Sequence, residues 1–158
     1  MNIRPARDSD GAALAALIAT TFAEYPGCLF LDEEFPELKA PASHYQRLGG
    51  QLFVAEAGGE VIGSLAAVMT PVGGTGELFK VYASAGHRGS GLAQRLYAEG
   101  EAYLKARGAR EIVLWSDTRF ARGHRFYEKL GFVREPVERY LADASASWEF
   151  FFRKPIAG

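Results

Sequence analysis

The stretch Glu77–Leu96 reads ELFKVYASAGHRGSGLAQRL and contains the transition on which the predicted fold depends. Residues 77–83 predict a strand, and a loop with three glycines follows at 86–91. Residues 92–106 predict a helix that Gly108 ends. Residues 112–115 (IVLW) then form a short apolar run typical of a strand buried on both faces. The order of strand, loop, helix and strand indicates a parallel crossover unit.

The glycine loop has the composition of an anion-binding site. Glycines allow close approach of the backbone to a ligand, and the N–H groups of a first helical turn all point one way. Together with the helix dipole they favour a negative ligand, and Arg88 adds positive charge at the entrance. We expect a diphosphate, with a plain glycine-rich turn as the structural alternative. The loop lacks the features of a P-loop and the spacing of a dinucleotide fingerprint.

The sequence before this loop predicts an antiparallel meander. Residues 52–55 and 61–69 flank Gly58–Gly59, a two-residue hairpin signal, and the strand at 77–83 comes next. Nearer the N-terminus, Asp8 or Ser9 is expected to cap a helix. The apolar residues of that helix recur at helical spacing: Leu14, Leu17, Ile18 and Phe22. A second helix is expected near residues 42–48.

After the crossover, residues 119–130 predict a last helix, which Gly131 ends. Two strands, near residues 132–133 and 148–152, close the chain. The whole pattern predicts an α+β fold in which helices flank a mixed sheet. The run Phe150–Phe152 is expected to be an inner strand or part of a homodimer contact.

Composition limits the class of protein. The chain has 158 residues, 48% of them apolar and 23% charged, as in one soluble globular domain. We see no apolar run long enough for a membrane helix and no signal peptide, so we expect a cytoplasmic protein without a membrane partner. Cys28 is the only cysteine and the three histidines are scattered, so no metal site is expected.

Charge is distributed unevenly along the chain. Residues 1–79 carry four basic and ten acidic side chains, whereas residues 80–158 carry fourteen basic and nine acidic ones. This asymmetry indicates a C-terminal half that meets an anion and an N-terminal half that meets a cation, unless it reflects chance. The pI near 6.3 and the lack of a Lys/Arg run argue against a nucleic-acid partner.

Two motifs resemble those of the GNAT superfamily of N-acetyltransferases. Arg88, Gly91 and Ala93 fill the fixed positions of the superfamily's Gln/Arg-x-x-Gly-x-Gly/Ala loop. Residues 126–132 (FYEKLGF) are similar to its C-terminal Phe-Tyr-Glu-x-x-Gly-Phe motif. The resemblance spans most of residues 2–134. It implies a GNAT fold over residues 1–158 as a single domain, with a mixed, mostly antiparallel sheet of about seven strands and about four helices.

The resemblance also implies acetyl-coenzyme A as co-substrate. In the superfamily the loop binds the pyrophosphate, and amides of a splayed strand, here those of Val81 and Ala83, face the thioester. The residues assigned to the cofactor by the loop motif are Arg88, Gly89, Ser90, Gly91, Leu92 and Ala93.

The implied reaction is direct attack of a primary amine on acetyl-coenzyme A in a ternary complex. By its place in the motif, Tyr127 is the candidate general acid for the departing sulfur. Glu77, eleven residues before Arg88, is the candidate general base, acting through a water. The structural alternatives are a core tyrosine and a strand-edge glutamate. A Cys28–His44 nucleophile pair is not needed for direct transfer.

One position departs from the superfamily, and several questions stay open. An asparagine often precedes the Phe-Tyr pair, but Phe120 stands there in this chain. Arg119, Arg122 and Arg125 recur every three residues and form either a solvated face or a contact to a coenzyme A phosphate. The acceptor is a small-molecule or peptide amine, and the acidic stretch 24–37 favours a cationic one. The alternatives are transfer from a longer acyl-coenzyme A and a non-catalytic acyl-coenzyme A-binding module.

Overall fold

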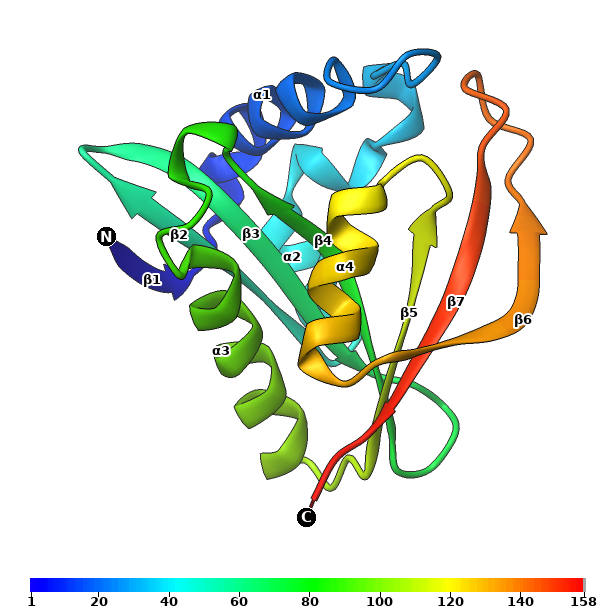
Figure 1. The fold of residues 1–158 in the computed structure, drawn as a ribbon. Coiled ribbons are helices and arrows are strands. Elements are labelled where there is room, and N and C mark those ends of the chain that lie inside the picture. The colour runs from blue at the N-terminus through cyan, green and yellow to red at the C-terminus, as the bar shows by residue number, and fades with distance from the viewer. Residues whose placement is uncertain (158) are drawn as a thin grey trace.

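The computed structural model describes residues 1–157, in which seven strands form one mixed sheet in the order β1-β2-β3-β4-β5-β7-β6 (Figure 1). The strands are β1 (Asn2–Pro5), β2 (Gly50–Ala57), β3 (Glu60–Met69), β4 (Thr75–Ala83), β5 (Glu111–Asp117), β6 (Val133–Tyr140) and β7 (Trp148–Pro155). The α-helices are α1 (Gly11–Phe22), α2 (Pro41–Arg47), α3 (Leu92–Ala106) and α4 (Ala121–Leu130). Short 3-10 turns lie at Asp8–Asp10, Asp32–Glu34, Pro36–Lys39 and Ala85–His87.

The predicted topology is confirmed. Strands β2, β3 and β4 form the antiparallel meander, and β4 pairs with β5 in parallel across the crossover helix α3. Strand β7 lies between β5 and β6, antiparallel to both, so Phe150–Phe152 belongs to an inner strand. Among the helices of residues 1–157, none has both the length and the apolarity needed to cross a membrane.

The sheet separates two apolar cores. Successive side chains of a strand point to opposite faces, so Phe53 and Ala55 of β2 pack toward α3, whereas Leu52 and Val54 pack toward α1 and α2. Helices α3 and α4 therefore cover one face, and α1 and α2 cover the other (Figure 1). The predicted apolar face of α1, including Leu14, is buried.

The sheet splits at its centre. Backbone pairing between β4 and β5 covers only Thr75–Glu77 and Glu111–Val113, although both strands continue beyond these residues. The register of β4 against β3 also shifts near Lys80, which has a left-handed backbone (φ +52°). The hydroxyl of Ser64 donates to the Lys80 carbonyl at 2.6 Å and fixes this bulge. The gap between β4 and β5 is therefore built into the fold.

Two helix starts differ from the sequence-based expectation. Helix α1 begins at Gly11 rather than after Asp8 or Ser9, because the carboxylates before it are used elsewhere. Asp8 accepts from Ser43 N at 2.8 Å, and Asp10 binds both guanidinium nitrogens of Arg4 at 2.9 Å. Helix α4 begins at Ala121, not at residue 119.

The last two strands are also longer than predicted. Strand β6 reaches Tyr140 and β7 reaches Pro155, although residues 135–158 carry no recognisable motif. A register shift between Glu135 and Glu138 accommodates Pro136, which cannot donate a ladder hydrogen bond.

Candidate active site

The gap between β4 and β5 opens into two cavities that meet. One, of about 440 Å³, lies against the glycine loop, α3 and α4, and we call it the basic cavity. The other, of about 330 Å³, lies on the side of residues 28–37 and the β6–β7 connection, and we call it the acidic cavity. The residues that line both are Val81, Tyr82, Ser116, Phe120 and Tyr127.

The glycine loop forms one wall of the basic cavity. Gly91 caps α3 with a left-handed backbone (φ +82°), which glycine adopts without steric cost. The loop residues that line the cavity are Arg88, Gly89, Gly91, Leu92 and Ala93, and Gln94 joins them without having been predicted. Ser90 does not line it, because its hydroxyl donates back to the His87 carbonyl at 2.5 Å and closes the loop. The first turn of α3 thus presents its N–H groups beside this cavity.

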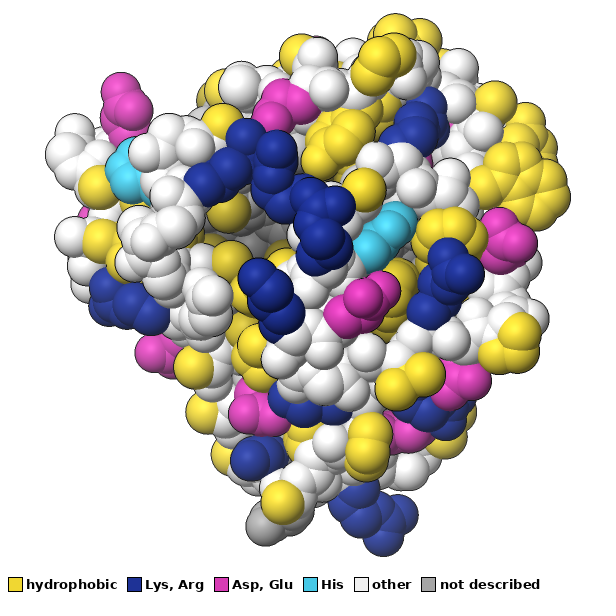
Figure 2. Space-filling view, in the orientation of Figure 1, with side chains coloured by type: hydrophobic (Ala, Val, Ile, Leu, Met, Phe, Trp, Pro, Cys, Tyr) yellow, Lys and Arg dark blue, Asp and Glu magenta, His cyan; other side chains and the backbone are white. Residues whose placement is uncertain are grey.

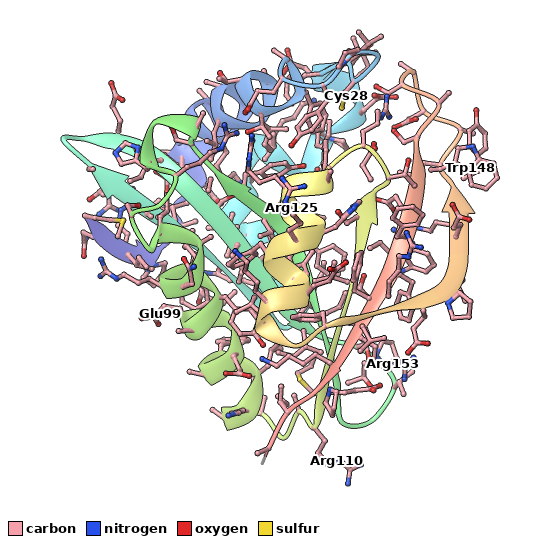
Figure 3. All side chains as sticks on the ribbon, viewed as in Figure 1. Cys28, Glu99, Arg110, Arg125, Trp148 and Arg153 are labelled. Atoms are coloured by element: carbon pink, nitrogen blue, oxygen red, sulfur yellow. The ribbon has the colours of Figure 1, made fainter. Side chains whose placement is uncertain are left out.

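Cationic side chains surround the opening of this cavity. Arg88 of the loop and Arg122, Arg125 and Lys129 of α4 line it. Figure 2 shows Lys and Arg side chains gathered around a hollow between α3 and α4, and Figure 3 shows Arg125 at the near face of α4. Glu24 accepts from both Arg88 and Arg122, so one carboxylate joins the loop to α4.

Arg119 does not belong to this basic group, which corrects the three-arginine face expected on the last helix. It precedes α4 and forms an ion pair with Asp117 at the end of β5, at 2.9 Å. The Asp117 carboxylate also accepts from the Arg119 backbone N–H at 2.9 Å, which holds this residue outside the helix. Of the three arginines, Arg122 and Arg125 line the basic cavity.

Val81 and Ala83 lie where β4 has left β5. The Ser84 N–H donates to Ile62 of β3 at 2.8 Å. Because amide directions alternate along a strand, the amides of Val81 and Ala83 are directed away from β3 and into the gap. Both residues line the basic cavity, and Val81 lines the acidic one as well.

Tyr127 lies at the junction of the two cavities. Its side chain is 6% exposed and packs against Phe132 and Phe152, with ring centroids 5.9 and 5.7 Å away. Burial raises the pKa of its phenol above the ordinary value of 10.0, so the hydroxyl keeps its proton at neutral pH. The protonated hydroxyl can donate a hydrogen bond to a neighbouring ligand, although the raised pKa makes it a weaker acid than a tyrosine in water.

Glu77 lies in the acidic cavity at the point where β4 and β5 separate. Its carboxyl is half-buried, and burial raises its pKa, with Arg139 opposing and Glu149 adding to the shift. A carboxylate with a raised pKa is a better proton acceptor than one in water. Glu77 and Tyr127 line the same cavity, as the proposed pair of acid and base requires.

Carboxylates outnumber cations in the acidic cavity. The acids that line it are Glu34, Glu37, Glu77, Asp117, Asp143 and Glu149, against the cations Lys80 and Arg139. Lys80 is paired with Glu37 at 2.9 Å, and Arg139 with Glu149 at 2.7 Å. Aromatic rings form much of the remaining wall: Phe22, Phe35, Phe79, Trp115 and Phe120. The cavity is therefore suited to a positively charged ligand with an apolar body.

Phe120 lies at the boundary of the two cavities, at the position where the superfamily often has an asparagine. Its ring packs against Tyr25 at 5.0 Å and Phe22 at 5.9 Å between ring centroids. A phenyl ring cannot make the hydrogen bond of the superfamily's asparagine at this position. It instead continues the aromatic wall of the acidic cavity.

Cys28 and the histidines do not behave as nucleophilic groups. Burial raises the pKa of the Cys28 thiol to about 11, so it stays protonated at neutral pH. His44 packs edge-on against Tyr45. His124 is half-buried, and burial lowers its pKa. No group of His, Cys, Asp and Glu side chains within residues 1–157 is arranged to hold a metal ion.

Comparison with known proteins gives the same assignment as the motifs. The model of the acetyltransferase (GNAT) family matches residues 14–132. A mycothiol acetyltransferase of Thermobispora bispora is 31% identical over 141 residues, which are 85% of this chain. The chain spans about half (46%) of that relative's length.

Solved structures share the fold at low sequence identity. A GNAT-family acetyltransferase of Staphylococcus aureus Mu50 superposes with a TM-score of 0.82 at 18% identity, over 98% of both chains. A Salmonella typhimurium protein solved with acetyl-CoA gives a TM-score of 0.72 at 21% identity, over 98% of this chain and 92% of that one. The family match over three quarters of the chain, together with this fold, shows that the chain belongs to the acetyltransferase (GNAT) family.

Proposed function

We propose that this chain transfers the acetyl group of acetyl-coenzyme A to a primary amine by direct attack in a ternary complex. The observation that carries the proposal is the meeting of a basic and an acidic cavity at Tyr127. A ligand rich in phosphate fits the first cavity, and a cationic amine fits the second. Their reacting ends would then meet in the gap between β4 and β5.

The co-substrate assignment is supported by the loop geometry and by a structural relative. Gly91 opens the N-terminus of α3, and Arg88 adds charge beside it, which suits a pyrophosphate. The Salmonella typhimurium protein of the same fold contains acetyl-CoA. Arg122 and Arg125 are placed to bind further phosphate oxygens.

The reaction needs a base, an oxyanion contact and an acid. Glu77, through a water, takes the proton of the incoming ammonium, and the free amine nitrogen attacks the thioester carbon. The backbone N–H of Val81 or Ala83 donates to the carbonyl oxygen as it gains negative charge. The carbon–sulfur bond then breaks, and Tyr127 gives its proton to the departing thiolate. The second proton that the attacking nitrogen loses as the amide forms returns the Tyr127 phenolate to its neutral form. The products are an amide and coenzyme A.

The free carboxylate in the acceptor cavity favours catalysis over simple binding of acyl-coenzyme A. Glu77 is half-buried with a raised pKa, a costly arrangement that a binding module would not need. The excess of acids over cations in the same cavity favours an acceptor with positive charge beyond the reacting amine.

A panel of amines tests this proposal. We expect release of free thiol from acetyl-coenzyme A with diamines and aminosugars, and slower release with uncharged amines of similar size. The product should be the N-acetyl amide, identified by mass spectrometry. Binding of acetyl-coenzyme A without thiol release for any amine would instead favour a binding module.

Removal of the Tyr127 hydroxyl should slow turnover without weakening cofactor binding. A positioned general acid contributes roughly 10²–10⁴-fold. Thiolate is a fair leaving group, so we expect Tyr127→Phe to lower kcat by about 100-fold or less, with little change in KM for acetyl-coenzyme A. Steady-state thiol release measures this loss.

The matched control for this variant is Tyr97→Phe. Tyr97 is also a buried tyrosine, but it lies on α3, where its hydroxyl interacts with Glu101 and Lys154. We expect wild-type turnover from the control. Wild-type turnover from Tyr127→Phe, with chemistry limiting the rate, would make Tyr127 a packing residue.

A further inference from the structure

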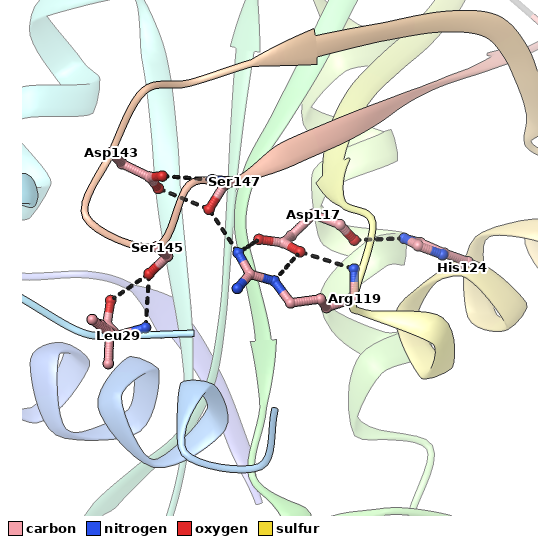
Figure 4. Close-up of polar contacts among 7 residues, drawn as sticks. All are labelled: Leu29, Asp117, Arg119, His124, Asp143, Ser145 and Ser147. Carbon is pink, nitrogen blue, oxygen red and sulfur yellow. Dashed lines mark hydrogen bonds and ion pairs between the residues drawn. The ribbon is translucent and has the colours of Figure 1, made fainter. Parts of the chain in front are cut away.

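A polar network joins the end of β5 to the connection between β6 and β7 (Figure 4). Asp117 and Ser147 are both buried, 7% and 5% exposed, and the Arg119 guanidinium lies between them. Arg119 donates to both carboxylate oxygens of Asp117 and to the Ser147 hydroxyl, each at 2.9 Å. None of the three belongs to the two sequence motifs that resemble the superfamily, and none has a role in the proposed chemistry.

The direction of the Ser147 hydrogen bonds is fixed by its neighbours. Arginine has only donors, so the Ser147 hydroxyl accepts from Arg119 and must use its own proton elsewhere. It donates that proton to the Asp143 carboxylate at 2.8 Å, and the Ser147 backbone N–H donates to the same carboxylate at 2.7 Å. Arg119 thus sets the orientation of Asp143, which lines the acidic cavity.

The same connection is tied to the opposite wall of the acidic cavity. The Leu29 N–H donates to the Ser145 hydroxyl at 2.7 Å, and the Ala144 N–H donates to Glu34 at 2.8 Å. These contacts join segments more than a hundred residues apart in sequence, with separations of 116 and 110. The connection therefore closes one end of the cavity.

The backbone of this connection is held in an unfavourable conformation. Ala142 and Ala146 both have left-handed backbones, with φ of +53° and +49°. Residues with a Cβ rarely adopt this region unless surrounding contacts impose it. The polar contacts of Ser145 and Ser147 supply that constraint, so their loss should let residues 141–147 relax.

The network also reaches the helix that carries Tyr127. The carbonyl of Asp117 lies 2.9 Å from Nε2 of His124, one turn before Tyr127 on α4. Asp117, at the end of β5, thus contacts both Arg119 of the network and the helix that carries the candidate acid.

We propose that Arg119 is a positioning residue for the acceptor: through Ser147 it holds residues 141–147, and Asp143 in particular, against the acceptor cavity. The inference rests on the proposed function, because it takes the acidic cavity as the acceptor site. Arg119 does not itself line either cavity, so it acts through Ser147 and Asp143.

Ser147→Ala is the sharpest test. It removes the hydroxyl between Arg119 and Asp143 but leaves the Arg119–Asp117 ion pair intact, so no buried charge loses its partner. Loss of a hydrogen bond to a charged group predicts a KM for the amine that is roughly tenfold higher. The KM for acetyl-coenzyme A should stay within about twofold of wild type, since the basic cavity is untouched.

The control variant is Arg153→Lys. Arg153 also forms an ion pair, with Glu111 at 3.1 Å, but it lies on β7 far from the connection (Figure 3). Neither KM should change in this variant. A second variant, Arg119→Lys, keeps the charge but lacks the fork that binds Asp117 and Ser147 together, and should raise the amine KM as Ser147→Ala does.

Amide hydrogen exchange provides a readout that does not depend on activity. The amides of Leu29, Ala144 and Ser147 should exchange faster in Ser147→Ala than in wild type. An unchanged amine KM in an active, folded Ser147→Ala variant overturns the positioning role. If the wild-type chain releases no thiol with any amine, the proposed function is overturned instead. In that case hydrogen exchange still tests the network, because unchanged exchange at these amides in Ser147→Ala would overturn the anchoring of residues 141–147.

Discussion

Replacement of Gly91 by valine should reduce the affinity for coenzyme A by at least about 100-fold, because two or more charge-assisted hydrogen bonds to the pyrophosphate would be lost. Gly91 has φ of +82°, which a β-branched residue does not tolerate, and a side chain there would project into the space where we propose that the phosphates bind. No protein atom lies within 4 Å of a Cβ built at this position, so the space is open to a ligand.

Gly108→Val is the control that distinguishes the effect of backbone strain from loss of the proposed pyrophosphate site. Gly108 follows the other end of α3, has φ of +89°, and also has open space around its Cβ position. Both variants should lose similar stability in thermal unfolding, but only Gly91→Val should lose heat of binding in calorimetry with coenzyme A. Equal affinity of wild type and a folded Gly91→Val would show that the pyrophosphate binds elsewhere.

Replacement of Glu77 by glutamine should lower kcat at pH 7 by roughly 10²–10⁴-fold, the usual contribution of a positioned base. An alkyl amine has a pKa near 10, so at neutral pH the acceptor arrives protonated and needs the base. The loss should shrink as the pH rises, because more of the amine is then already neutral. A pH–rate profile of both enzymes measures this, with Glu111→Gln on β5 as the control.

The same substitution should not destabilise the fold. Burial raises the pKa of Glu77 in the folded chain above its unfolded value, so ionisation of this group opposes folding, and this opposition grows as the pH rises above the unfolded pKa. Glutamine removes that cost, so the melting temperature at pH 7 should be equal or higher. A variant with wild-type rates at every pH would show that the base lies elsewhere.

Much of the fold could be predicted because its local signals agree with its tertiary contacts. The Gly58–Gly59 hairpin and the helix at 92–106 each combine a turn residue with a matching apolar pattern, and both have the predicted bounds within a few residues. The start of α4 could not be predicted in this way. Arg119 has good helix propensity, but its ion pair with Asp117 holds it outside the helix.

The residues of the candidate site also differ in whether the sequence alone could identify them. The glycine loop and Tyr127 lie in short motifs whose residues are adjacent in sequence, so they could be found without a structure. The acidic cavity also contains residues that only the pairing of β7 with β5, and of β6 with β7, brings there: Arg139, Asp143 and Glu149. No pattern in residues 135–158 marks them, because their partners in the cavity are distant in sequence.

A crystal structure of the complex with coenzyme A tests the central claim most directly, since that claim is the meeting of two ligands at Tyr127. We predict pyrophosphate oxygens within hydrogen-bond distance of the amides of residues 89–93, and the thiol sulfur beside the Tyr127 hydroxyl, facing the acidic cavity. A coenzyme whose pyrophosphate lies away from this loop, or whose sulfur points away from Tyr127 and the acidic cavity, would contradict the account.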